Sequence, residues 1–363
     1  MGKYSTEFFA GMDVSDKSVE IFILRLDADE GESMKVANSR ESLSAFAESF
    51  ERPSEVKVAL ETGTHSSWQA DLLRSKGLDV TVANARKLRA IWQSDDKSDA
   101  TDAEMLARLL RAEPKLLCGV RVKDRKVRDA LVAVKARDCL SGCRTKLINT
   151  VRGLLKSEAV DSSGLDAHSF GAKAMALIPK VLRKSLKPLV EQIARLDGEL
   201  KLYDKQIDAL RKQFDGCQEV SQIKGVGPLT SLTFVLTVGD PMRFQSGGRL
   251  ASYLGLVPKR DQSGETDRQC HITKAGSTLL RRYLVQAAHY VMGPFGDREC
   301  DLRKFGDRIA ARGGKNAKRR AVVAVARKLA VIMLKLWKTG EEYDPQYSKN
   351  RKLRAKAKTK AAA

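Results

Sequence analysis

Four carboxylates in the first third of the chain stand where side chains from separate elements can meet. Asp13 and Glu61 each end an apolar run, "FFAGMD" and "EVKVALE", while Asp99 and Asp102 open a helix in "KSDATDAEMLARLL". Carboxylates that gather in one place repel one another, and burial adds to that cost, unless cations accompany them. Mg²⁺ or Mn²⁺ suits such oxygen ligands and keeps positions free for phosphate oxygens. The set therefore predicts a metal site, in which two ions can stabilise the attacking and leaving oxygens of a phosphodiester.

Each of these carboxylates also has a purely structural explanation. Acidic side chains in the first turn of a helix interact favourably with its dipole, which accounts for Asp99 and Asp102. Asp13 and Glu61 precede turn-forming residues and can cap those turns. However, Asp102 shares a helical stripe with Leu106, and an apolar stripe should face inward. An acidic stripe turned toward the interior is what a metal site requires, so we interpret the four residues as one site.

A serine in the back half of the chain is the second candidate for chemistry. Ser263 lies in "KRDQSGETDR", a stretch that we expect to be a polar loop, with Lys259, Arg260 and Arg268 nearby. Its hydroxyl can attack a phosphorus atom because flanking cations stabilise the charge that develops. No histidine stands beside it, since His271 is eight residues further on. The alternative is that "QSG" is only a turn.

The elements that must position the four carboxylates form a mixed α/β pattern through residues 1–110. Runs of apolar residues predict strands, and apolar spacings of three and four predict helices. We expect two strands around a turn at 7–26, a helix at 41–50, a strand ending at Glu61, a helix closing on Gly77, a strand in "LDVTVAN" and the helix that carries the aspartates. Strands that alternate with helices indicate a sheet covered by helices.

From about residue 111 the chain is predicted to be helical and basic. A long amphipathic helix is expected at 124–156, followed by a linker at 157–172 and clean heptads over 186–210. The heptads predict a coiled coil that brings subunits together. The alternatives are a helix packed in its own domain and a helix that pairs within the chain against 124–156.

A further globular part is expected beyond these helices. Ile223, Gly225, Val226 and Gly227 fit the hairpin of a helix-hairpin-helix, whose glycines let backbone amides approach a phosphate, although a plain turn fits equally well. A helix with one apolar face is expected at 317–338. The basic tail that follows has no apolar pattern, which predicts disorder.

The net charge of +21 points to a polyanionic partner. Residues 1–110 contain 14 basic and 20 acidic residues, a charge of about −6, whereas the rest of the chain carries about +27. Such a basic back half favours nucleic acid through counterion release, and a solvated basic surface is the alternative. No apolar run approaches a membrane span, the chain starts without a basic-then-apolar leader, and the six cysteines lack metal-ligand spacing. We therefore expect a soluble cytoplasmic protein with reduced thiols and no membrane partner.

These stretches together resemble the DEDD-type transposases of bacterial insertion sequences, a family that includes the Piv-like DNA invertases and the bridge-RNA-guided serine recombinases. "GMDVSDKSVEIFIL" is similar to the family's first strands with their catalytic aspartate, here Asp13, and "ALETGTHSSW" to the segment around the catalytic glutamate, here Glu61. "DDKSDATDAEMLARLL" is similar to the K-T-D-x-x-D-A motif and supplies Asp99 and Asp102, with Ser98 in place of the more usual threonine.

The back half carries the rest of the resemblance. "IKGVGPLTSLTFVLTVGDPMRFQSGGRLASYLGLVP", "QSG" and "ITKAGSTLLRRYLVQAA" look like the family's carboxy-terminal transposase domain, and Ser263 falls on its nucleophilic serine. The resemblance implies an RNase H-like (RuvC-like) DEDD catalytic domain at 1–110 and basic helices with a coiled-coil dimerisation region at 111–215. It also implies a mainly α transposase domain with the serine and a helix-hairpin-helix-like element at 216–342, and a basic disordered tail at 343–363.

The function implied by the resemblance is recombination of DNA. Members cut and rejoin DNA through a covalent phosphoserine, with Mg²⁺ and acidic residues of one subunit meeting the serine of another. A non-coding bridge RNA pairs with both donor and target DNA, in an assembly expected to be a homodimer, or a tetramer on DNA, in the bacterial cytoplasm at the nucleoid. Two other functions stay open: a metal-dependent Holliday-junction-type endonuclease with Ser263 only in a turn, and a non-catalytic nucleic-acid-binding protein.

Basic side chains around the serine and near two helix starts are candidates for nucleic-acid contacts. Each of them can equally be a solvated surface charge. They are Lys259, Arg260, Arg268, Lys274, Arg281, Arg282, Lys315, Lys318, Arg319 and Arg320.

Overall fold

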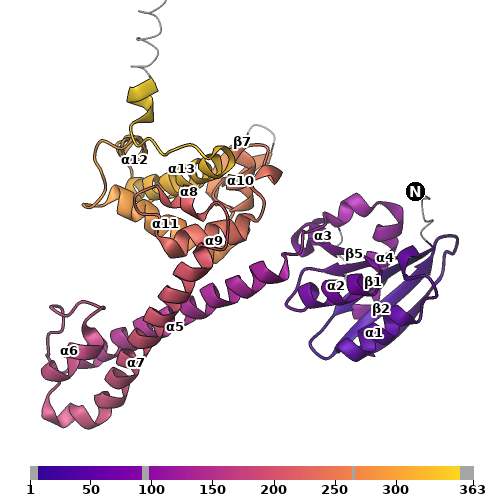
Figure 1. The fold of residues 1–363 in the computed structure, drawn as a ribbon, viewed down its shortest axis with the longest axis horizontal. Coiled ribbons are helices and arrows are strands. Elements are labelled where there is room, and N and C mark those ends of the chain that lie inside the picture. The colour runs from indigo at the N-terminus through magenta and orange to yellow at the C-terminus, as the bar shows by residue number, and fades with distance from the viewer. Residues whose placement is uncertain (1–6, 92–97, 264–265, 352–363) are drawn as a thin grey trace, which may run out of the picture. The chain divides into compact units, whose positions relative to one another are not determined.

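The computed structural model describes residues 7–91, 98–263 and 266–351, and for 89–91, 260–263 and 266–269 it describes the backbone only. The chain separates into two compact units, Met1–Asp124 and Arg125–Ala363, which we describe one at a time (Figure 1).

A five-stranded mixed sheet forms the centre of the first unit. Its order is β3-β2-β1-β4-β5, in which β1, β2 and β3 pair antiparallel while β1, β4 and β5 pair parallel. This topology is compatible with the RNase H-like fold expected for this part of the chain. The strands are β1 (Phe8–Val14), β2 (Ser18–Arg25), β3 (Gly31–Ala37), β4 (Val56–Glu61) and β5 (Asp79–Ala83).

The central strand β1 supplies side chains to two apolar layers. Ala10 and Met12 lie in the cluster built with α1 (Arg40–Glu48) and α2 (Ser66–Ser75). Phe9 lies instead in a cluster with Leu106 of α4 (Asp99–Ala112). Side chains alternate along a strand, so the positions that share the face of Phe9 are directed toward α4. The remaining helical segments of this unit are η1 (Pro53–Glu55), α3 (Ala85–Ile91) and η2 (Pro114–Leu117).

The strands and helices expected around the carboxylates are confirmed, but the strand β3, the helix α3 and the two short segments η1 and η2 were not predicted. The edge strand β3 reads "GESMKVA", and only Met34 and Val36 in it are large apolar residues. Because the strand is mostly exposed, it needs no apolar alternation and leaves no such pattern in the sequence. The short helix α3 was also missed.

Two long helices, α5 (Arg125–Ser157) and α7 (Lys180–Arg211), run side by side in the second unit (Figure 1). The heptad residues Leu186 and Ile193 are buried in a cluster with residues of α5 and of α6 (Phe170–Leu177). This is the pairing within one chain that was one alternative to self-association. Of the expected linker at 157–172, residues 158–169 connect α5 to α6 without a helix or strand. Its end differs from the expectation, because Phe170 begins α6 and is fully buried in that same cluster.

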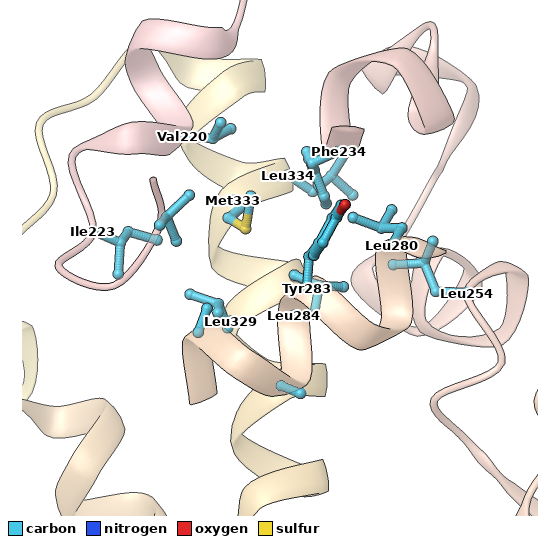
Figure 2. Packing of buried hydrophobic residues seen from close by; sticks show 14 of the residues in the cluster. Val220, Ile223, Phe234, Leu254, Leu280, Tyr283, Leu284, Leu329, Met333 and Leu334 are labelled. Atoms are coloured by element: carbon cyan, nitrogen blue, oxygen red, sulfur yellow. The ribbon is translucent and has the colours of Figure 1, made fainter. Parts of the chain in front are cut away.

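The carboxy-terminal part of the second unit packs around α13. Figure 2 shows Phe234 of α9, Tyr283 and Leu284 of α11, and Leu329 and Met333 of α13 in one apolar core. The apolar face expected at 317–338 is therefore confirmed as a core element. The segments are α8 (Cys217–Ser221), α9 (Pro228–Val238), η3 (Pro241–Arg243), α10 (Gly247–Tyr253), β6 (Pro258–Ser263), β7 (Thr266–Ile272), α11 (Thr278–Met292), α12 (Asp301–Ala310) and α13 (Ala317–Thr339).

Two further expectations for this part are corrected. The polar stretch around Ser263 is not a loop, because β6 and β7 pair antiparallel there, with cross-strand hydrogen bonds in place of an apolar pattern. The start of the expected disordered tail is ordered: the amide of Asp301 donates to the carbonyl of Pro345, and the amide of Ser348 donates to the Asp301 carboxylate at 2.7 Å. Residues 352–363 lie outside the described residues. No described helix is long and apolar enough to cross a bilayer.

Candidate active site

Two of the four carboxylates come from the carboxyl ends of neighbouring parallel strands. Asp13 is the second-last residue of β1, and Glu61 is the last residue of β4. The register pairs Met12 with Leu60, so the next residue of each strand emerges at the same edge of the sheet. This edge is where open α/β sheets commonly bind ligands.

The other two carboxylates reach that edge because α4 packs directly on β1. A Cβ atom at Gly11 would overlap the carbonyl oxygen of Ala103 and lie 2.6 Å from the amide nitrogen of Ala107. Glycine at this position therefore permits a close approach of helix and strand backbones. Asp13 lies two residues beyond Gly11 on the same face, and Asp102 immediately precedes Ala103. The first turn of α4 is thereby held beside Asp13.

The start of α4 is fixed by its own cap. Ser98 has extended backbone angles, and its hydroxyl oxygen accepts a hydrogen bond from the amide of Thr101 at 3.2 Å. A serine cap satisfies an amide that would otherwise lack a partner and defines where the helix begins. Asp99 and Asp102 consequently occupy the first turn, and the serine found in place of threonine retains the capping function.

The electrostatics of Asp13 indicate that the other three carboxylates lie near enough to act on it. Burial, and then the negative charges of Asp99, Asp102 and Glu61, raise the pKa of Asp13 to about 6. An isolated aspartate at the surface titrates near pH 4. Negative charges therefore surround the half-buried carboxyl group of Asp13 and oppose its ionisation.

This arrangement fits a divalent cation in the chemistry of its donors. A half-buried aspartate whose charge is destabilised by three neighbouring carboxylates suits a Mg²⁺ ligand set. In the described part of the chain, however, no three acidic, histidine or cysteine side chains surround a single point closely enough to hold an ion. The carboxylates are gathered, but their side chains do not form a closed coordination shell.

The sheet adds a fifth carboxylate and a cation that the sequence analysis missed. Glu20 on β2 lies directly opposite Asp13, and Lys35 on β3 lies directly opposite Glu20. The Lys35 ammonium is 2.5 Å from a Glu20 carboxylate oxygen, and this contact, together with the charge of Asp99, raises the pKa of Lys35. The register of the expected strands β1 and β2 was a signal for Glu20, whereas the position of Lys35 could not be read without β3. For the close approach of α4 to β1, the signal in the sequence was an isolated glycine, Gly11, inside an expected strand.

Ser263 is the last residue of β6, where its backbone pairs in register with Thr266. Its side chain lies outside the described atoms. Because Ser263 and the carboxylates belong to different compact units, its meeting with them stays a prediction.

The basic residues proposed to contact nucleic acid divide into different groups. Lys259, Lys274, Lys315, Lys318, Arg319 and Arg320 are exposed, and the side chains of Arg260 and Arg268 lie outside the described atoms. Arg282 is half-exposed and forms an ion pair with Asp138 of α5 at 2.6 Å.

The expectation that Arg281 contacts nucleic acid is corrected, because only 8% of its surface is exposed. Its guanidinium donates to the carbonyls of Leu254 and Ala275 and to the hydroxyl of Thr278. A buried arginine engaged in this way joins α10 to the start of α11, and its charge is not presented to a phosphate.

Two transposase family models match separate segments of the chain. A transposase family model of the IS110 DEDD type matches residues 10–159, which contain all four carboxylates. A model described as the transposase IS116/IS110/IS902 family matches residues 217–299, which contain Ser263.

Individual relatives carry the same description. The chain is 30% identical over 261 residues to a transposase for insertion sequence element IS1111A of Coxiella burnetii, covering 69% of this chain and 70% of that protein. It is 28% identical over 345 residues to a putative transposase of Sinorhizobium fredii, covering 90% and 84% of the two chains. A probable family 20 transposase of Pseudomonas aeruginosa is 29% identical over 247 residues, covering 65% and 71%.

The carboxylates of the sheet edge and the serine-bearing hairpin thus fall inside the two matched segments, in the expected order. The chain belongs to the DEDD-type transposases of the IS110 group of bacterial insertion sequences, and it is a DNA transposase.

Proposed function

We propose that this transposase is an RNA-guided DNA recombinase that cuts and rejoins DNA through a covalent bond to Ser263. The observation that carries the metal-dependent part of the proposal is that two strand ends and the first turn of α4 meet at one sheet edge, where burial and then three other carboxylates raise the pKa of Asp13. A fold gains nothing in stability from such repulsion, so a cation that relieves it is the simplest reason for the arrangement.

Asp13, Glu61, Asp99 and Asp102 are the residues that would hold Mg²⁺ or Mn²⁺. When bound, such an ion polarises a phosphodiester and lowers the pKa of a hydroxyl that attacks it. The protein supplies the positions: two strand ends from a rigid sheet and one capped helix turn. Elements held this firmly keep ligands in a fixed geometry before the substrate arrives.

Ser263 is proposed as the nucleophile. Its hydroxyl oxygen forms a bond to phosphorus while the bond from phosphorus to a sugar oxygen breaks, and that oxygen takes up the proton lost by the serine. The bond energy is retained in the phosphoserine, so the reverse attack by another strand end rejoins DNA without an external energy source. Lys259, Arg260 and Arg268 would stabilise the charge on the phosphoryl oxygens.

Specificity is proposed to come from a non-coding bridge RNA that pairs with donor and target DNA. The protein would then read backbone and duplex shape, which is the division of labour in other RNA-guided systems. The positive charge of about +27 on residues 111–363 supports binding of both nucleic acids. We further propose that the site is completed between subunits of a homodimer or tetramer.

The test is to purify the protein, sequence any RNA that accompanies it, and add matching DNA with Mg²⁺. A protein–DNA adduct that resists denaturation is expected for the wild type and is expected to vanish in Ser263→Ala. Ser252→Ala is the matched control, because Ser252 is an exposed serine of the same part of the chain. Free cut ends that persist in Ser263→Ala would instead support a metal-dependent endonuclease.

A further inference from the structure

An aromatic pair stands on the surface of the second unit, away from the residues discussed so far. Phe295 lies in the connection between α11 and α12, and 78% of its surface is exposed. Its ring stacks on that of Tyr290 with an interplanar angle of 21° and 6.4 Å between the centroids. Tyr290 therefore supports one side of Phe295, and the high exposure leaves the other side open to solvent.

The exposure of Phe295 is imposed by a fixed loop. A Cβ atom at Gly296 would overlap the carbonyl oxygen of Val291, and one at Gly293 would lie 2.8 Å from the carbonyl oxygen of His289. The carbonyl of Gly293 also accepts a hydrogen bond from the guanidinium of Arg303 at 2.5 Å. Both ends of the loop are thus held against α11, and Phe295 projects from its tip. An apolar ring that is held in water loses little conformational entropy when a ligand covers it.

A pocket of about 170 Å³ adjoins the aromatic pair. Tyr290 lines it, together with Gln222, Ile223, Lys224, Cys300 and Tyr343. Most of this lining is apolar or aromatic. Lys224 and Asp297 add one charge of each sign, and the amide oxygen of Gln222 accepts a hydrogen bond from the backbone amide of Tyr343. An apolar hollow with a few polar groups is the usual form of a site for a small planar group.

The glycine turn between α8 and α9 forms one wall of this pocket. Gly225 has a positive φ of 94°, and a Cβ atom there would lie 2.8 Å from the Cδ1 atom of Tyr290. The turn that was considered as a helix-hairpin-helix element therefore packs directly on the aromatic pair. The pocket, Lys224 and the aromatic pair form one continuous surface.

We propose that this surface binds an unpaired segment of DNA, with one base stacked on the open side of Phe295 and the neighbouring nucleotide in the pocket. The inference deepens the proposed function, since it requires DNA that has been opened or cut. Bases of an intact duplex are stacked on each other, whereas an unpaired base has a free π-face for an aromatic side chain. The basic character of this part of the chain supplies the attraction for the backbone.

The experiment measures binding of short oligonucleotides to the full-length protein by fluorescence anisotropy, with EDTA present so that no metal-dependent step occurs. Phe295→Leu keeps an apolar side chain but removes the π-face. We expect it to weaken binding of oligothymidylate on the order of tenfold and to leave binding of a duplex unchanged. Tyr347→Leu is the control, because Tyr347 is also an exposed aromatic residue of this unit, at 50% exposure.

Phe295→Trp provides a direct readout. Its affinity for oligothymidylate should equal that of the wild type, and its added tryptophan emission should be quenched when the base stacks. Equal affinities of Phe295→Leu and wild type, or equal losses for duplex and single strand, would overturn the proposal. So would a loss for oligouridylate alone, which would assign the surface to RNA, or a change only in oligomeric mass, which would make it a protein interface.

The outcome is separable from that of the proposed recombination. If Ser263→Ala still forms the adduct, or if no adduct forms at all, the proposed function fails while the Phe295 measurement in EDTA remains valid. If Phe295→Leu binds normally, the adduct experiment is unaffected.

Discussion

Gly11 of β1 and Ala103 of α4 touch through their backbones, and this contact sets the distance between the helix and the strand that carry three of the four carboxylates. A side chain at position 11 would have to displace the helix. The position of Asp99 and Asp102 relative to Asp13 therefore depends on a residue that has no chemistry of its own.

Gly11→Ala adds only one methyl group, but we expect it to lower both the stability of the fold and the rate of strand transfer. The added methyl must push α4 outward, because its neighbours are backbone atoms that cannot rotate away. Overpacking of this kind destabilises a fold by about 1–3 kcal/mol. A shift of about 1 Å in a catalytic group can lower a rate by about 100-fold. Thermal unfolding and a strand-transfer assay on the same preparation would measure both effects.

Gly142→Ala is the matched control for this prediction. Gly142 lies on the exposed side of α5, and a Cβ atom there would meet nothing within 4 Å. Alanine is favoured over glycine inside a helix by roughly 0.5–1 kcal/mol, so this variant should be slightly more stable and fully active. Full activity in Gly11→Ala would contradict the role given to the close approach.

The stability of the metal-free protein should fall as the pH rises through the range in which Asp13 ionises. The folded pKa of about 6 lies above the unfolded value near 4, so the folded state binds more protons between these limits. The free energy of unfolding therefore decreases with rising pH across this window, and the contribution of the protonated form is fully lost above about pH 6.

Melting temperatures recorded in EDTA between pH 4 and pH 7 would test this sign. Asp13→Asn cannot ionise, so it should lose this component of the pH dependence. Because protons and divalent ions compete for the same oxygen atoms, added Mg²⁺ should stabilise the wild type more at pH 7 than at pH 5. A wild-type profile identical to that of Asp13→Asn would show that the carboxylates do not interact.

Lys35→Ala should strengthen divalent-ion binding without harming the fold. Lys35 pairs with Glu20 and interacts with Asp99, so its positive charge opposes an incoming cation. Removal of that charge should tighten Mg²⁺ binding roughly two- to fivefold at low salt. Calorimetric titration would measure the change.

Lys76→Ala serves as the control for Lys35→Ala. Lys76 forms a comparable surface ion pair, 2.6 Å from Glu48, but neither residue is among those that influence Asp13. Its removal should leave Mg²⁺ affinity unchanged. An equal effect of both substitutions would reflect net charge rather than position.

Arg281→Ala should reduce the stability of the fold, whereas Lys318→Ala should reduce the affinity for DNA. Arg281 makes buried hydrogen bonds to backbone carbonyls, so its loss should destabilise the protein by roughly 2–3 kcal/mol. Lys318 is exposed, so its loss should leave the melting temperature unchanged and weaken DNA binding instead. If Lys318 contacts a phosphate, the slope of log affinity against log salt should fall by about 0.9. Thermal unfolding and salt-dependent anisotropy distinguish the two behaviours.

Much of the first unit was predictable because its buried strands carry apolar patterns. The runs that end at Asp13 and Glu61 and the helix that opens at Asp99 were visible, so the sequence could place these carboxylates at the ends of their elements. Gly11 could not be assigned in the same way, because which helix crosses a strand is decided by tertiary packing. Lys35 was missed because its neighbours depend on β3, an exposed strand held by backbone hydrogen bonds, whereas Glu20 could have been placed opposite Asp13 from the register of the two expected strands.

In the second unit, the heptad pattern of α7 predicted which face is buried but not which segment packs against that face. The heptads of α7 identified the buried face correctly, but an apolar stripe does not state whether its partner is another chain or another segment of the same chain. Strand β6, which ends in Ser263, contains no large apolar residue, so backbone pairing with β7 rather than hydrophobicity defines it. Arg281 was read as a surface charge because the sequence contains no sign of the carbonyls that surround it.

The long helical hairpin of α5 and α7 has a consequence for the divergence of related enzymes. Buried positions recur every seven residues along α7, at Leu186, Ile193, Leu200 and Ile207. Matched deletion of seven residues from each arm would shorten the hairpin by about 10 Å and keep the same faces in contact. The reach of this hairpin can therefore change by whole repeats during evolution, while the domains that carry the carboxylates and the serine keep their own sequences.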